Sequence, residues 1–199
     1  MAFLGTFAGA SARAFGASAG VVVGDFESIS TVTVGTATPT VEFTGIPATY
    51  THLQIRASLQ TARITFPLDK VFWRLNSDTG SNYSSHSLFG DGASVTSSSE
   101  PTTAISGFDN FTTTASPSSL GFGTLILDIL DYANTNKFTT TRALSGFDVN
   151  GTVSGFGGRV GLTSGNYRST NAITSVTFFV DNSANFSVNS KFALYGVKA

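Results

Sequence analysis

The sequence predicts an all-β protein: an antiparallel β-sandwich of jelly-roll type that carries an extended N-terminal arm. From residue 28 onward, short segments of β-branched, aromatic and alternating apolar residues are separated by turn residues. Charged residues make up only 12% of the 199 residues, whereas there are 18 phenylalanines and 21 glycines. No window of eleven or more residues combines a helical period with caps and freedom from Gly, Pro and β-branched residues. The length fits one such domain with an additional arm.

The predicted arm covers residues 1–27, and the predicted sandwich domain covers residues 28–199. The first twenty residues are mostly Gly, Ala, Ser and Phe, with too few large apolar groups to offset the entropy of ordering. They lack a basic start, so we expect no cleaved signal peptide. Exposed phenylalanines lower solubility unless something covers them. We therefore expect the arm to anchor the protein in an assembly; the alternative is a disordered terminus. The proposed anchor residues are Phe3, Phe7, Arg13 and Phe15.

The clearest strand lies at residues 51–60, where apolar and polar residues alternate over the whole segment. Other segments are shorter or less regular, but each is rich in strand-forming residues and ends at Gly, Pro, Asn or Asp. The other predicted strands are 28–34, 40–43, 71–76, 85–89, 137–145, 153–163, 174–181 and 190–197.

Two further segments are less typical. Residues 123–132, with the sequence GTLILDILDY, are apolar on both faces, which predicts a central strand buried on both sides. Residues 92–121 are rich in Ser, Thr, Gly and Pro, and we expect a long loop with one short strand. Asp128 lies among apolar neighbours, so it is either a buried, hydrogen-bonded carboxylate or a marker of the sheet edge.

The charge pattern and the absence of cysteine exclude several classes of function. Eleven basic and twelve acidic residues give a net charge of −1. No cluster of Lys and Arg could neutralise nucleic-acid phosphates or bind an anionic membrane surface. No run of 18 apolar residues predicts a transmembrane helix. Because the chain has no cysteine, disulfides, thiolate metal sites and cysteine nucleophiles are excluded.

The sequence offers no convincing catalytic or metal-binding motif. His52 is expected at the surface on the polar face of its strand. His86 lies among serines, which leaves a Ser–His–Asp triad open by residue type, but no Gly-x-Ser-x-Gly turn is present to position a serine nucleophile. The Asn76-x-Asp78-x-Gly80-x-Asn82 sequence resembles the first half of a calcium loop, but the closing acid is absent. A plain hairpin turn is the preferred interpretation. We therefore expect no catalytic residue, no metal and no cofactor.

Trp73 and Tyr83 are weak candidates for ligand binding. Aromatic faces can stack on a sugar ring, so the pair could form part of a glycan-binding surface. The alternative is that both side chains pack in the core, since large aromatic residues are usually buried.

Several segments resemble a widespread group of small virion proteins of tailed phages, described as tail-fibre or structural proteins. The resemblance covers roughly residues 45–199, and residues 10–16 are similar to short N-terminal starts of other phage appendage proteins. Leu75 stands where that group usually has Phe. The segments that carry the resemblance are 46–56, 75–83, 131–134, 172–176 and 192–198.

The resemblance implies a non-enzymatic component of a phage virion, located at the particle surface or tail. It favours a tail-fibre or appendage protein that docks by its arm and presents its sandwich for host attachment. Expected partners are other virion proteins, further copies in a homotrimer, and a host surface glycan, without nucleic acid or membrane insertion. A capsid-decorating cement protein is one alternative, distinguished by hundreds rather than tens of copies per particle. A carbohydrate-binding module is another.

Overall fold

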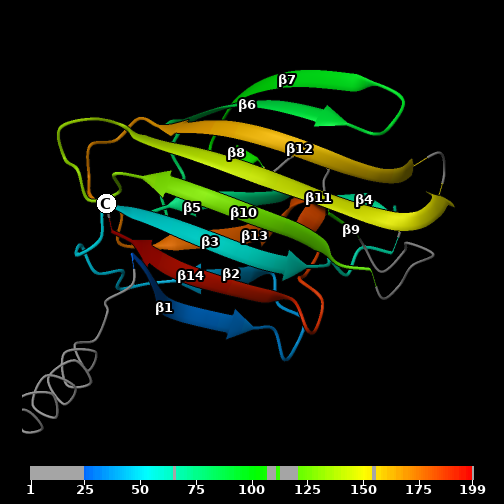
Figure 1. The fold of residues 1–199 in the computed structure, drawn as a ribbon, viewed down its shortest axis with the longest axis horizontal. Helices are drawn as coiled ribbons and strands as arrows, with labels where there is room; N and C mark the ends of the chain where they lie inside the picture. Colours follow the sequence, from blue (N-terminus) through cyan, green and yellow to red (C-terminus); the bar gives the residue numbers. More distant parts are fainter. Residues whose placement is uncertain (1–24, 65, 107–110, 113–120, 154–155, 199) are drawn as a thin grey trace, which may run out of the picture.

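The computed structural model describes residues 25–64, 66–106, 111–112, 121–153 and 156–198. Almost every regular element in them is a β-strand, and every pair of neighbouring strands is antiparallel (Figure 1). The predicted fold class, an antiparallel β-sandwich, is confirmed. The strands are β1 (Phe26–Thr33), β2 (Thr40–Phe43), β3 (His52–Leu59), β4 (Leu68–Asp69), β5 (Val71–Leu75), β6 (Tyr83–Gly90), β7 (Val95–Thr102), β8 (Ile105–Ser106), β9 (Phe111–Thr112), β10 (Gly123–Leu130), β11 (Thr139–Val153), β12 (Phe156–Tyr167), β13 (Val176–Val180) and β14 (Lys191–Val197).

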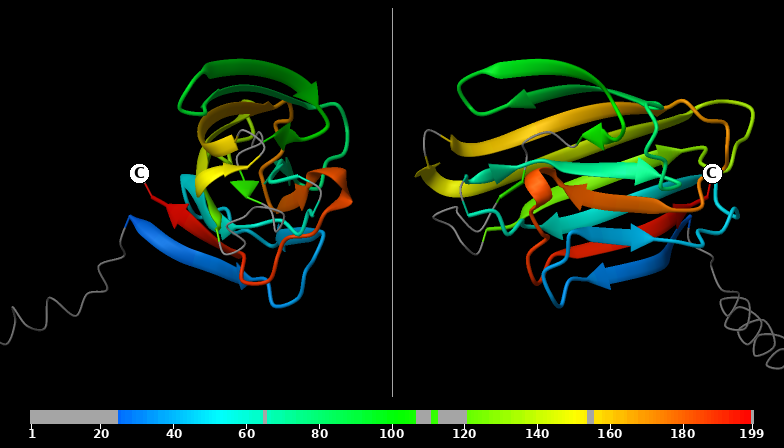
Figure 2. Two further views of the ribbon diagram at one scale, coloured as in Figure 1. Left: turned by 90° about the vertical axis from the view of Figure 1, so that its right-hand side faces the viewer. Right: turned by 180° about the vertical axis from the view of Figure 1, so that it is seen from behind.

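The larger layer is an eight-stranded sheet with the order β1-β14-β3-β10-β11-β12-β6-β7. A four-stranded sheet, β2-β13-β5-β8, packs against one face of it (Figure 2). The chain passes repeatedly between the two layers: β1 lies in the large sheet, β2 in the small one and β3 in the large one again. Strands β4 and β9 form a separate two-stranded pair.

The hydrophobic core lies between the two sheets and follows from the alternation of each strand. In β3, Leu53, Ile55 and Leu59 are fully buried, while Arg56 on the opposite face is exposed. The small sheet contributes Trp73 and Phe178, and Phe186 and Phe192 pack edge-to-face with ring centroids 5.1 Å apart. Such close packing of large side chains supplies most of the stability of a domain of this size.

Two details of the predicted strand pattern are wrong. The segment expected to be mainly loop contains the eight-residue strand β7, which pairs with β6 over its whole length. Strand β10 is central in the sheet, but only its inner face is buried; Ile126 and Leu130 on its outer face are exposed. The small sheet is narrower than the large one, and it covers only the inner face.

Candidate interaction surface

The outer face of the eight-stranded sheet carries a row of exposed apolar side chains. The strand register places Ile126 opposite Leu144, Leu144 opposite Leu162, and Leu162 opposite Leu88, so the row crosses β10, β11, β12 and β6. These four side chains are 39–50% exposed. Scattered exposed apolar residues are ordinary, but a contiguous exposed group marks a contact surface.

Two valines extend this row toward the end of the sheet. Val160 lies two residues before Leu162 on β12, and Val95 on β7 pairs with Gly90 of β6. They are 59% and 72% exposed. Two neighbouring shallow depressions, which share Leu144 and Val160 in their lining, run along the group. We call the six residues Leu88, Val95, Ile126, Leu144, Val160 and Leu162 the apolar strip.

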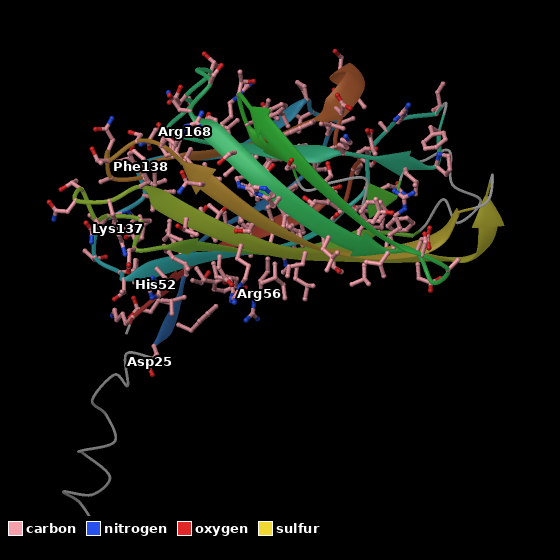
Figure 3. The ribbon with its side chains drawn as sticks, turned by 90° about the horizontal axis from the view of Figure 1, so that it is seen from above. Asp25, His52, Arg56, Lys137, Phe138 and Arg168 are labelled. Carbon is pink, nitrogen blue, oxygen red and sulfur yellow. The ribbon has the colours of Figure 1, made fainter. Side chains whose placement is uncertain are left out.

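An aromatic cluster lies on the same face near the other edge of the sheet. The guanidinium of Arg56 lies 5.0 Å from the ring centroid of Phe26 and 5.6 Å from that of Tyr195. The two rings are themselves 5.1 Å apart. Figure 3 shows Arg56 pointing away from the body of the molecule. Arg56 also lines the depression next to Ile126, so the aromatic cluster continues into the apolar strip.

Beside the apolar strip, the outer face carries a group of polar side chains that pair with one another: Gln54, Asp128 and Arg142. Asp128 accepts hydrogen bonds from Gln54 Nε2 and from the Arg142 guanidinium, both at 2.8 Å. Of the two predictions for Asp128, the sheet-edge one is wrong, since β10 is an interior strand; the carboxylate is hydrogen-bonded as the other expected, but it is half-buried on the outer face rather than buried. The Asp128 carboxylate is therefore satisfied within the protein.

The loops at one end of the sandwich are fixed by charged pairs. Asp131 pairs with the Lys137 ammonium, and His52 Nδ1 accepts the backbone N–H of Asp131 at 3.0 Å. The hydrogen bond from Lys137 lowers the pKa of the Asp131 carboxyl. Asp25, where the described chain begins, lies at this same end with His52 and Lys137 (Figure 3). These groups secure loops, and none of them lies in a cleft.

Strand β1 is fastened at its first residues. The Lys198 ammonium and the Tyr50 hydroxyl donate to Glu27 at 2.7 Å and 2.9 Å. These two hydrogen bonds, the Lys198 one foremost, lower the pKa of Glu27. The Lys198 backbone N–H donates to the Asp25 carbonyl at 2.9 Å. The first described residues, Asp25 to Glu27, are therefore tied to Tyr50 and Lys198.

The Asn76–Asn82 segment is a structural turn. Asp78 accepts hydrogen bonds from the Gly80 N–H at 2.7 Å, from Asn82 Nδ2 at 2.8 Å and from the Tyr167 hydroxyl at 3.0 Å. The Asn82 bond foremost, and then the Gly80 bond, hold the pKa of Asp78 below its usual value. Both carboxylate oxygens are engaged within the protein, as the hairpin interpretation requires.

Trp73 and Tyr83 are fully buried, so neither can stack on a sugar, and the ligand-binding assignment is corrected to core packing. Tyr83 stacks on Tyr167 with ring centroids 4.8 Å apart, and its hydroxyl donates to the Leu75 carbonyl at 3.0 Å. Burial raises the pKa of Tyr83. Strand alternation explains the burial of Trp73, which shares the inner face of β5 with Val71 and Leu75.

The described residues include no group of three His, Asp or Glu side chains placed to hold a metal ion. The described part of the chain contains no helix of sufficient length and apolar character to cross a membrane. His86 is exposed on the outer face of β6. The proposed anchors Phe3, Phe7, Arg13 and Phe15 lie outside the described residues.

The apolar strip could not be recognised in the sequence, because its Leu, Ile and Val side chains are of the types that fill hydrophobic cores. In β10 both faces are apolar, and the sequence alone does not tell which face the second sheet covers. The signal was present in the paired strands, since Leu144 and Leu162 occupy positions that alternate with Ser145, Gly161 and Thr163. The strand order was needed to place them side by side.

Comparison with known proteins gives no match: no family model, no curated protein and no solved structure is similar to this chain.

Proposed function

We propose that this protein is a structural component of a phage virion, a tail-fibre or appendage protein that works by contact. Its N-terminal arm docks into the particle, and its sandwich is presented toward the host surface. The observation that carries the proposal is the apolar strip, a contiguous exposed group on the outer face of the eight-stranded sheet. A surface of this kind is buried when subunits assemble.

The charge distribution supports a role in assembly. With a net charge of −1, the copies repel one another weakly and tolerate close packing. Asp128 is paired with Gln54 and Arg142 on this face, whereas the apolar side chains of the strip gain free energy when a contact removes them from water. A homotrimer would bury the apolar strip of each copy in the same way, because closed symmetry buries equivalent surfaces on every copy.

The experiment uses particles of the virus that encodes this chain. The chain lacking residues 1–20 should fail to enter particles, whereas the full chain should be present at fixed stoichiometry. Circular dichroism of the purified truncated chain should retain the β spectrum, which separates loss of docking from loss of folding. Normal incorporation of the truncated chain would refute docking by the arm.

Copy number distinguishes the two virion roles. A tail-fibre or appendage protein should be present in a few to a few tens of copies per particle, and a cement protein in hundreds. Quantitative mass spectrometry of purified particles measures this number. A count in the hundreds would replace the fibre assignment with the cement assignment.

A further inference from the structure

We infer that, in the free protein, the apolar strip is covered by residues 1–20 of the same chain, which lie back across the outer face of the eight-stranded sheet. The inference rests on the proposed assembly role and adds a regulatory element to it. When the arm docks into the particle, the strip becomes available to a neighbouring subunit.

The position at which the described chain begins supports this occupant. Phe26 follows Asp25 directly, and its ring belongs to the aromatic cluster with Tyr195 and Arg56 on the outer face. The described chain therefore begins beside the outer face of the large sheet, the face that carries the apolar strip. The Asp25 carbonyl is held by the Lys198 N–H, so this starting point stays in place.

The reach of the arm is sufficient. Between β1 and β6 there are six strand spacings, about 29 Å at ~4.8 Å per spacing. Phe15 lies eleven residues before Phe26, and an extended segment of that length spans about 36 Å. Phe15 can therefore reach the strip as far as β6, and Phe7 and Phe3, which lie further along the same segment, can reach β7.

The chemistry of the two surfaces is complementary. Residues 1–20 contain one charged side chain, Arg13, and three phenylalanines. The strip contains six apolar side chains and no charge. Tethering gives the arm an effective concentration in the millimolar range, far above that of a second copy in a dilute solution.

The size of the strip favours an extended segment over a second sandwich. Six side chains that are 39–72% exposed present on the order of 500 Å² of apolar surface, similar to the largest patch on a typical monomer. Two such faces packed together would bury about 1,000 Å², below the usual 1,200–2,000 Å² of an interface that is stable on its own, so free copies in dilute solution do not pair through the strip alone. An extended peptide of about ten residues needs no more area than the strip provides.

The test uses the full chain, which has no cysteine of its own. The variant Gly16→Cys/Thr124→Cys places one thiol beside Phe15 and one beside Ile126, with every phenylalanine and strip residue kept. A short bis-maleimide should link the two thiols within one chain. Adding Leu144→Ser/Leu162→Ser should lower the rate of this intrachain link at least fivefold.

The matched control changes exposed residues of β11 and β12 outside the strip. Thr140→Ala/Ser164→Ala, in the same two-cysteine background, should leave the linking rate unchanged. Equal rates in the serine variant and in this control, or products that join two copies, would overturn the inference. The unfolding midpoint of each variant is measured in parallel, so that a folding defect is recognised.

The outcome also separates this inference from the proposed function. In one outcome, the rate of the intrachain crosslink does not depend on the strip, while removal of residues 1–20 still prevents entry into particles. Residues 1–20 then do not cover the strip, and the proposed assembly role stands. In the opposite outcome, the rate of the crosslink depends on the strip, but particles contain no copy of the protein. Residues 1–20 then cover the strip, and the proposed virion role is wrong.

Discussion

Gly165 faces the small sheet with no room for a side chain, and its replacement by alanine tests the packing of the two sheets. Gly165 is on the inner face of β12, opposite Thr141 of β11. A Cβ added there would lie 2.6 Å from Thr141 Oγ1 and 2.8 Å from two methyl carbons of Ile105 in the small sheet. Ile105 is fully buried and pairs with Trp73. The methyl group of alanine must therefore push the two sheets apart.

The expected loss follows from the size of the clash. Ordinary carbon contacts begin near 3.5 Å, so Ile105 and Thr141 must move by several tenths of an ångström or more. Overpacking of this kind costs about 1–3 kcal/mol. The lower freedom of the unfolded alanine chain offsets about 0.4–1 kcal/mol. We expect Gly165→Ala to lower the free energy of unfolding by about 1–2 kcal/mol, equivalent to about 2–8 °C in Tm.

Urea unfolding followed by tryptophan fluorescence measures this change. Trp73 is the only tryptophan and is fully buried, so its emission reports unfolding of the core next to the clash. Ile105→Val removes one of the two clashing methyl groups. The double variant should therefore lose at least ~0.5 kcal/mol less than the sum of the single losses. Gly35→Ala is the control, because no atom lies within 4 Å of its added Cβ. An unchanged midpoint for Gly165→Ala, or additive losses, would refute the packing argument.

Three further predictions concern single residues. Leu127→Ala, on the buried face of β10, should cost about 2–5 kcal/mol, whereas Ile126→Ala on the exposed face should cost less than about 1 kcal/mol; equal losses in urea unfolding would contradict the assigned faces. Burial raises the pKa of Asp69, against the hydrogen bonds from Thr61 and the Lys70 N–H. Its stabilising contribution is therefore full below the unfolded pKa of about 3.9 and is lost as pH rises through the folded pKa. Asp69→Asn should gain stability relative to the native chain between pH 3 and pH 7, and a constant difference over that range would contradict this. Asp78→Ala removes three hydrogen bonds to a carboxylate and should cost about 2–3 kcal/mol at pH 7; a smaller loss at acid pH is expected because the pKa of Asp78 is lowered.

The strands that alternate strictly could be predicted from the sequence. In residues 51–60, one face of the segment is apolar and the other polar, and the structure buries the apolar face. Strand β7 lacked this signal because its described side chains are exposed or half-buried, so no apolar alternation marks it. It is held as an edge strand by backbone pairing with β6, which residue types do not encode.

The candidate surface could not be predicted, because exposure depends on which sheet covers which face. Ile126 and Leu127 are both apolar, yet one faces solvent and the other the core. Trp73 and Tyr83 illustrate the converse: aromatic character suggested binding, but their strand positions face inward. The residue types on each face of a strand can be read directly from its sequence. Which face is exposed depends on the strands that pack against it, and these lie far away along the chain.

The central claim, that this chain works as a structural component of a virion through its apolar strip, is tested most directly by counting its copies in purified particles. Quantitative mass spectrometry should find the native chain at fixed stoichiometry. The variant Leu144→Ser/Leu162→Ser, with an unchanged unfolding midpoint, should be reduced at least tenfold. Particles that contain no native chain, or that take up the variant at the native copy number, would contradict the account.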